Sequence, residues 1–307
     1  MDSTCEVFLH SNKERLHAAQ ANVEGAKEEE AAAVKKSEIA STVSTNLLRE
    51  PLPPGCQEVL LELRARTEQI LDTLSPDLVK FYNENVSVSA EKAIDIARDT
   101  ASQNEEKWFR ERKLRITGSK CYCLYTYSSN KKADWAKKIR GTFNSNFTGN
   151  QATLYGLVNG PVARSLYASK NKCTVVENGL FVNPLLPWLG CSVDGLVVND
   201  EKKPKFSIEI KCLTAGKTKP ASDIPKYEKC FDKDNCLKKR HQFYGQMQLG
   251  LLLMGLPKCD FVVYSSFDHN IETIPVPFDA AFAHAMVDKL ISVYFCYVLP
   301  WLKENFE

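Results

Sequence analysis

The chain has 307 residues, of which 44% are apolar and 25% are charged. These proportions are typical of a soluble globular protein and exclude a fibrous or wholly disordered one. The 40 Lys and Arg residues nearly balance the 38 Asp and Glu residues, so the formal charge of +2 neither favours nor excludes a nucleic-acid partner. At about 150 residues per domain, the length allows two domains, or one domain with an extension.

The first third of the chain has a helical pattern. Residues 1–46 are rich in Ala, Glu and Lys and have few large apolar side chains, so we predict a flexible or helical charged arm. Apolar residues then recur at helical spacing, with a break near Ser75-Pro76, and Ser89 opens a further helix. We therefore predict a helical accessory region over 47–104.

The pattern changes after about residue 172 to short apolar or β-branched runs, which predict strands over 173–182, 188–198, 206–212, 259–266 and 271–278. The last run contains two prolines, as befits an edge strand. A short polar linker joins 188–198 to 206–212 and predicts a hairpin. Helices are expected over 241–254 and from about 279 to 301. We predict one α/β domain over 105–307, with a central mixed sheet flanked by helices.

The eleven cysteines are the unusual part of the composition. An odd number without a signal peptide favours reduced thiols in an intracellular, reducing compartment, which includes the nucleus if the source is eukaryotic. The pairs Cys121-x-Cys123 and Cys230-x5-Cys236 lack companion histidines at zinc-site spacing, so we expect no structural zinc. No run reaches the about 18 apolar residues of a bilayer span, so we expect no membrane partner.

The predicted strand 206–212 carries the chemistry. Alternation places Ile208, Ile210 and Cys212 on one face and Ser207, Glu209 and Lys211 on the other. Hairpin pairing can bring Asp194 beside the second face. Two carboxylates with an ammonium group suit a magnesium-dependent phosphodiesterase, because carboxylate oxygens hold a cation that polarises a phosphoryl oxygen. The lysine can position the attacking water and offset developing charge.

On the spacing alone, a strand with one solvated polar face is the commoner explanation. Glu-x-Lys occurs four times in the chain, so the triplet alone is a weak signal. The copy at Glu209 is the one that lies inside an apolar strand run and follows an Asp-Gly pair across a hairpin. From the residues alone, a metal–phosphoryl site and a solvated face both stay open.

Four short motifs follow one another in order: Trp108…Arg112…Ile116-Thr117-Gly118-Ser119, Gly190-Cys191-Ser192-Val193-Asp194-Gly195, Glu209-Ile210-Lys211-Cys212 and Tyr244-Gly245-Gln246-Met247-Gln248. With these motifs, roughly residues 105–300 resemble the YqaJ-type viral recombinases, which include the lambda exonuclease and belong to the PD-(D/E)xK nuclease superfamily. The resemblance implies a restriction-endonuclease-like fold and a Mg²⁺-dependent 5′→3′ exonuclease (Mn²⁺ possible) that hydrolyses linear double-stranded DNA in recombination or repair.

The resemblance also implies roles for individual residues. Asp194 and Glu209 would be metal ligands together with the backbone carbonyl of Ile210. Lys211 would be the catalytic lysine, and Gln246 would orient the water or the metal. Arg112, Ser119 and Ser192 match the positions that bind the 5′-phosphate of the processed strand. A ring-shaped trimer and a single-strand annealing protein are the implied partners besides DNA ends.

One departure from the family concerns the metal site. The segment from Gly156 to Arg164 matches the family frame, but Gly160 stands where the family has a supporting glutamate. Fewer carboxylates weaken Mg²⁺ binding. A nearby residue compensates, the chemistry runs with one metal, or the protein is a catalytically degenerate nuclease fold that acts as a DNA-end-binding module.

Residues 107–140 form a basic segment, with eleven Lys and Arg residues against Glu111 and Asp134, a net charge of +9. Tyr122, Tyr125, Tyr127 and Trp135 are interleaved with them. Such a run is usually a solvated face. Beside a nuclease-like site it indicates a strip that contacts the DNA backbone, with salt-sensitive binding.

Overall fold

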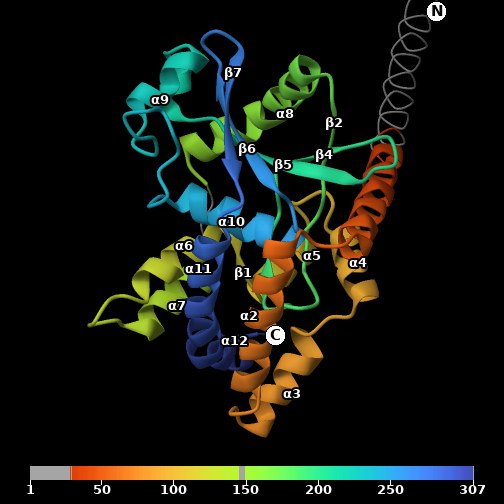
Figure 1. Ribbon diagram of the computed structural model, residues 1–307, viewed down its shortest axis with the longest axis vertical. Coiled ribbons are helices and arrows are strands. Elements are labelled where there is room, and N and C mark those ends of the chain that lie inside the picture. Colours follow the sequence, from red (N-terminus) through yellow and green to blue (C-terminus); the bar gives the residue numbers. More distant parts are fainter. Residues whose placement is uncertain (1–27, 29, 145–148, 307) are drawn as a thin grey trace, which may run out of the picture.

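The computed structural model describes residues 28, 30–144 and 149–306, so most of the predicted arm, residues 1–27 and 29, lies outside the described part. A five-stranded sheet forms the centre, in the order β2-β4-β5-β6-β7 (Figure 1). Strands β5 and β6 run parallel and the other neighbouring pairs antiparallel, which confirms the predicted mixed sheet. The strands are β2 (Thr174–Val176), β4 (Gly195–Val198), β5 (Pro204–Lys211), β6 (Lys258–Ser265) and β7 (Asn270–Pro277).

Two predicted strands are shorter or divided. The run 188–198 is not one strand: β3 (Leu189–Gly190) pairs in parallel with β1 (Ile116–Thr117) in a separate sheet, and β4 begins only at Gly195. A side chain at Gly195 would lie 2.6 Å from Val175, so the chain enters the central sheet there by a close approach. The run 173–182 likewise leaves the sheet after Val176, because Gly179 passes against the backbone of Ala97, where a Cβ would have no room.

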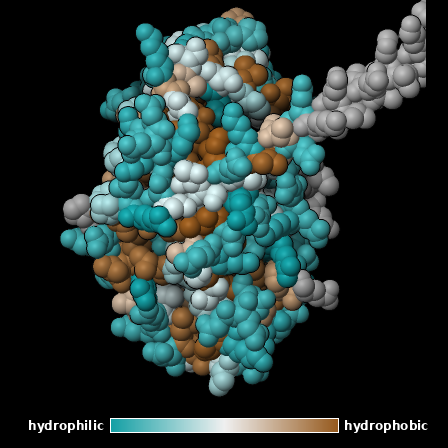
Figure 2. All heavy atoms as spheres, turned by 90° about the vertical axis from the view of Figure 1, so that its right-hand side faces the viewer, coloured by the Kyte–Doolittle hydropathy of each residue, from teal (hydrophilic) through white to brown (hydrophobic). Residues whose placement is uncertain are grey.

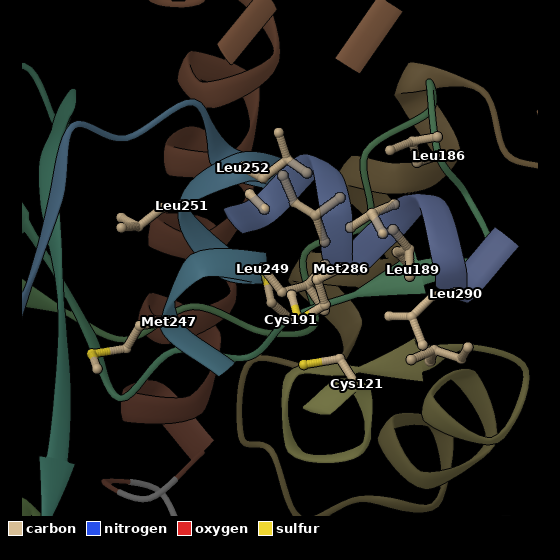
Figure 3. Packing of buried hydrophobic residues seen from close by; sticks show 14 of the residues in the cluster. Cys121, Leu186, Leu189, Cys191, Met247, Leu249, Leu251, Leu252, Met286 and Leu290 are labelled. Carbon is tan, nitrogen blue, oxygen red and sulfur yellow. The ribbon is translucent and has the colours of Figure 1, made fainter. Parts of the chain in front are cut away.

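Helices cover both faces of the sheet, as expected for an α/β domain. Helix α8 (Gln151–Asn171) lies over one face, where Ala163 and Tyr167 pack against Ile208 and Ile210. Helix α10 (Gln242–Met254) lies over the other, beginning after the cap residue His241 as predicted. Around α10, residues of α6 (Gly118–Tyr127) and α11 (Ala280–Val293) complete the main core, with Cys121, Leu249 and Met286 close together (Figure 3).

The first third is helical as predicted. A helix over residues 30–49 is followed by α2 (Pro54–Leu71), α3 (Pro76–Asn85), α4 (Ala90–Asp99) and α5 (Glu106–Lys113), and α7 (Trp135–Phe143) follows α6. The break at Ser75-Pro76 separates α2 from α3, and the Ser89 hydroxyl caps α4 by accepting a hydrogen bond from the Lys92 amide. Leu60 and Leu63 of α2 are fully buried in the main core, so α2 packs closely on the sheet domain. The proposed domain boundaries stay a prediction.

Short helical turns, Thr214–Lys217, Ala221–Asp223 and α9 (Ile224–Tyr227), connect β5 to α10. At the C-terminal end, α11 continues through a π-helical turn (Tyr294–Val298) into α12 (Leu299–Asn305). By length and composition alone, Ala280–Asn305 is long and apolar enough to cross a membrane, with a mean hydropathy of 1.4 in its most apolar window, although His284, Asp288 and Lys289 interrupt it. That window is 56% buried inside the protein, which accounts for its apolar composition. Figure 2 shows the side of the molecule that carries helix 30–49, where hydrophilic residues dominate and hydrophobic ones form separate patches.

Candidate functional site

The polar face of β5 is buried rather than solvated. Ser207 and Glu209 are each only 2% exposed and lie on the α10 side of the sheet, whereas Ile208 and Ile210 face α8. The predicted alternation is therefore confirmed, and Cys212 packs on the same side as the two isoleucines. Burial of a carboxylate is costly unless it has partners. The solvated-face alternative does not apply to Glu209.

Five of the predicted residues take part in two neighbouring groups of hydrogen bonds. The hairpin register pairs Gly195 with Ile208, so Asp194 lies at the point where β4 meets the middle of β5. The Asp194 carboxylate accepts a hydrogen bond from the Ile210 amide (2.7 Å). The Oε1 atom of Glu209 accepts from Lys211 Nζ (2.5 Å) and from Gln246 Nε2 of α10 (2.6 Å). Residues from three elements thus meet at one end of the hairpin.

The charges in this cluster strongly affect one another. The pKa of the Glu209 carboxyl is raised to about 7, because burial, with the help of the neighbouring Asp194, outweighs the lowering effects of Lys211 and Gln246. Burial lowers the pKa of Lys211, but Glu209 and Asp194 outweigh burial and hold it above its ordinary value. Lys211 is therefore an ammonium at neutral pH. Two crowded carboxylates with one ammonium are an arrangement that a cation would stabilise.

The cluster offers a small number of oxygen atoms that could bind a hard cation. Asp194 and Glu209 offer carboxylate oxygens, and Ile210 lies between them in the hydrogen-bonded cluster, which suits Mg²⁺, an ion that binds through one or two carboxylates and keeps several waters. Within the described residues, no group of three or more His, Cys, Asp or Glu side chains could hold a metal. The cluster therefore suits an open Mg²⁺ site and not a closed cage of protein ligands.

Gly160 lies where the missing carboxylate would be expected. It is on α8 and lines a groove of about 500 Å³ together with Asp194 and Lys211. A Cβ built on Gly160 meets no atom within 4 Å, so the position opens into free space. The groove beside Asp194 and Lys211 thus has room for a side chain at this position.

The three residues predicted to bind a 5′-phosphate gather in a second cavity. Arg112, Ser119 and Ser192 line a space of about 130 Å³ that Glu209 and Gln246 also border. The Arg112 guanidinium donates to the Ser119 hydroxyl (3.1 Å), and burial lowers the pKa of Arg112 to about 10. Two hydroxyls and a guanidinium beside the carboxylate cluster are suited to a terminal phosphate.

Trp108 organises this cavity, a role that its place in a motif did not reveal. The Arg112 guanidinium carbon lies 4.2 Å from the centroid of the Trp108 ring, within cation–π range. The indole N–H donates to the Ser192 hydroxyl (3.2 Å). One side chain therefore contacts two of the three predicted phosphate ligands.

Sequence reasoning also missed the groups that hold the Asp194 backbone. Arg164 of α8 donates through Nε to the Asp194 carbonyl (2.8 Å) and forms an ion pair with Glu177 (2.7 Å). Gln103, which lines both cavities, donates to the Asn178 carbonyl (2.6 Å). Arg164 could have been found from the Gly156–Arg164 frame, whereas Gln103 and Glu177 carry no local signal.

The basic segment 107–140 is not one continuous surface. Arg115 is fully buried and pairs with Glu111 (2.5 Å), and Lys120 lies over the Phe143 ring. Trp135 stacks on Tyr297, with 4.6 Å between ring centroids and 12° between the ring planes, so the protein itself occupies one face of the ring. The exposed basic residues are Arg110 of α5 and four residues of α7 and the turn before it: Lys131, Lys132, Lys137 and Arg140.

Residues 107–253 match the YqaJ-like viral recombinase domain, which confirms the resemblance carried by the four motifs. The match contains every predicted site residue. It does not extend to the helix over 30–49 or to α2, α3 and α4. No curated protein matches the chain significantly.

Several solved structures are similar in part. An alkaline exonuclease from Laribacter hongkongensis is 24% identical over 66% of this chain and 97% of its own, with a TM-score of 0.48. A phage-related exonuclease from Haemophilus somnus is 14% identical over 62% and 96%, with a TM-score of 0.42. The SOX protein of KSHV, solved with RNA, is 12% identical over 87% and 95%, with a TM-score of 0.47.

Proposed function

We propose, from the YqaJ-like viral recombinase domain that residues 107–253 match, that this protein is a Mg²⁺-dependent deoxyribonuclease. Its proposed reaction is the hydrolysis of phosphodiester bonds from the ends of linear double-stranded DNA in the 5′→3′ direction, in recombination or repair. Water is the proposed nucleophile, with no covalent intermediate. Mn²⁺ is the proposed substitute for Mg²⁺.

The observation that carries the proposal is that the carboxylate cluster adjoins the cavity lined by Arg112. The carboxylates of Asp194 and Glu209 lie with Lys211 at the end of one hairpin, and Glu209 also borders the cavity of Arg112. A terminal phosphate bound in that cavity would place the adjoining phosphodiester beside the carboxylates. Such an arrangement favours cleavage at ends over cleavage within the duplex.

Each residue of the carboxylate cluster has a proposed task. Asp194, Glu209 and the Ile210 carbonyl would hold Mg²⁺, which supplies polarisation of a phosphoryl oxygen and a water of lowered pKa when bound. The Lys211 ammonium offsets the negative charge that develops on the phosphoryl group. Gln246 fixes the orientation of the Glu209 carboxylate through its 2.6 Å hydrogen bond.

The test is digestion of linear, 5′-phosphorylated duplex DNA with Mg²⁺ or Mn²⁺ by the full chain, beside an Asp194→Ala variant of verified fold. We expect acid-soluble nucleotides from the wild type and none from the variant. Equal release by both proteins would show that a contaminant or another site is responsible. Equal digestion of circular duplex would contradict the dependence on ends.

Gly160 favours a second candidate, a catalytically degenerate nuclease fold that binds DNA ends. The groove lacks the carboxylate that the family has at this position, and the described residues offer no cluster of three ligands. If the protein bound phosphorylated duplex but released no nucleotides with either metal, this candidate would be supported and the proposed nuclease activity would be contradicted.

The remaining partners are proposals from the family resemblance. A homotrimer and a single-strand annealing protein would be tested by sedimentation velocity and by co-purification with defined annealing proteins. The exposed lysines and arginine of α7 form the proposed contact to the DNA backbone. All ten cysteines in the described part of the chain carry free thiols, which agrees with the predicted reducing compartment without identifying it.

A further inference from the structure

The helix over residues 30–49 lies outside the matched domain yet contacts the strand that precedes the catalytic hairpin. Val43 and Leu47 are buried against the main core. Lys36 forms an ion pair with Glu177 (2.8 Å), and the fully buried Ser44 hydroxyl donates to the Asn178 side-chain oxygen (3.3 Å). Two consecutive residues just after β2 therefore receive a polar contact from this helix.

The same two residues pass contacts on to the Asp194 turn. Glu177 holds Arg164 (2.7 Å), whose Nε donates to the Asp194 carbonyl (2.8 Å). The Asn178 carbonyl accepts from Gln103 (2.6 Å), which also donates to the Val193 carbonyl (3.4 Å). Both paths end on neighbouring carbonyl groups of one turn.

This turn needs such support. Residues 192–194 connect β3 to β4, which belong to different sheets, so no strand ladder fixes their backbone. Gln103 has a left-handed backbone (φ 55°), a conformation that costs free energy for a residue with a side chain and is kept only where the surroundings hold it. Its hydrogen bonds to two chain segments are the contacts that hold it.

We propose that the helix over 30–49 is a positioning element of the nuclease site, which sets the place of Asp194 through Glu177 and Asn178. The inference rests on the proposed function in taking Asp194 as a metal ligand. Glu177 and Asn178 are positioning residues, since neither touches the carboxylate cluster. Partners in a second layer around a metal site typically change metal affinity by about tenfold to a hundredfold when removed.

A readout that needs no metal is the exchange rate of the Ile210 amide, because its hydrogen bond goes to the Asp194 carboxylate. Glu177→Gln removes the negative charge that pairs with Lys36 and Arg164, and we expect this amide to exchange about tenfold faster in the full chain. The Val262 amide, in the neighbouring β6, reports the sheet itself and is expected to keep its wild-type rate.

Substitutions on the helix test the Lys36–Glu177 ion pair while the helix itself stays in place. Lys36→Met is expected to speed Ile210 exchange about threefold, the effect of a half-exposed ion pair. Lys36→Arg keeps the ion pair and is expected to restore the wild-type rate. Lys35→Met removes the same charge from an exposed position one residue earlier and is the matched control.

Calorimetric titration with Mn²⁺ then tests whether the turn affects metal binding. We expect the variants that speed Ile210 exchange to bind Mn²⁺ more weakly, in the same rank order. Faster exchange at Val262 as well as Ile210, or equal effects of Lys35→Met and Lys36→Met, would overturn the inference in favour of a general loss of stability. Unchanged Ile210 exchange in Glu177→Gln would overturn it directly. Selective exchange effects in a protein that binds no Mn²⁺ would support the positioning role and contradict the proposed function instead.

Discussion

The cavity of Arg112, which is proposed to bind a phosphate (the phosphate cavity), and the α8 groove adjoin at Gln103 but are built in different ways. In the cavity, Arg112 from α5, Ser119 from α6 and Ser192 from the turn before β4 are tied together by hydrogen bonds and by the Trp108 ring. In the groove, α8 offers two glycines that face open space, Gly156 and Gly160. Under the proposed function, the part that recognises a DNA end would be organised in advance, whereas the part that holds the metal would be short of negative charge.

The largest expected effect separates chemistry from end binding. Lys211→Met removes the ammonium from the carboxylate cluster but leaves the phosphate cavity intact. We expect nucleotide release to fall by about a thousandfold, within the range for a residue that acts directly on a transition state, while affinity for phosphorylated ends is kept. Lys217→Met, at an exposed lysine nearby, is the control for loss of charge. Equal losses in both variants would contradict the assigned role.

The converse variant disables the cavity alone. Arg112→Ala removes the guanidinium from Ser119 and from the space that a terminal phosphate would fill. We expect the preference for 5′-phosphorylated over 5′-hydroxyl duplex to fall by about a hundredfold, as for loss of a charged hydrogen bond. Rates on both ends are measured at saturating Mg²⁺. A wild type with no preference to lose would show that the cavity binds something else.

Filling the groove should strengthen the metal site. Gly160→Glu adds a carboxylate that has room in the groove, and we expect about tenfold tighter Mn²⁺ binding, because ligand charge governs affinity in such sites. Gly156→Glu, one turn earlier on α8, is the control for added charge. Only Gly156→Glu is expected to gain about 1 kcal/mol from replacing a helical glycine, because Gly160 precedes Pro161, whose ring disfavours a helical residue with a Cβ before it. Calorimetry distinguishes them. Equal affinities would mean that Gly160 is not the position of a missing ligand.

A smaller effect is expected inside the cavity. Trp108→Phe keeps an aromatic ring beside Arg112 but lacks the N–H that binds Ser192. We expect the preference for phosphorylated ends to fall about threefold, the value of one neutral hydrogen bond. Trp108→Leu also lacks the cation–π contact and should lose more of the preference. The same pair of DNA substrates gives the measurement, and a larger loss with Phe than with Leu would refute it.

The smallest effect concerns stability on the cavity side. Burial, and then the charge of Arg112, lowers the pKa of Lys120 from 10.5 to about 7. Between these pH values the unfolded chain binds a proton that the folded chain does not, so this residue adds stability as pH rises from 7 towards 10. Lys120→Met lacks this contribution.

The measurement is the difference in Tm between wild type and Lys120→Met, at pH 7, 8 and 9. It should shift steadily in favour of the wild type by a few degrees. A difference that is independent of pH would show that Lys120 keeps its ordinary pKa.

The sequence could predict those elements in which apolar and polar residues alternate or recur with a regular period. Alternation along β5 correctly placed Glu209 and Lys211 opposite Ile208 and Ile210, and a short polar linker identified the hairpin that brings Asp194 to them. The assignment of Arg112, Ser119 and Ser192 needed the family resemblance, because residues up to 80 positions apart show no common pattern.

What the sequence could not show depends on close approach between distant segments. The division of 188–198 into β3 and β4 follows from packing at Gly195, which no local propensity encodes. The support of this turn by Arg164 and Gln103 rests on hydrogen bonds to the carbonyls of Asp194 and Val193, which leave no mark on composition or periodicity. Burial of α2 in the main core also depends on partners near the other end of the chain.

The prolines of β7 bear on how copies of the protein can meet. Pro275 and Pro277 lie in the outermost strand of the described sheet, opposite Asp260 and Lys258. Neither has an N–H group to offer to an incoming strand, and an edge so interrupted is a poor template for further β-pairing. The sheet is thereby closed to extension along β7, so self-association by strand addition and the aggregation that begins from it are disfavoured at this edge.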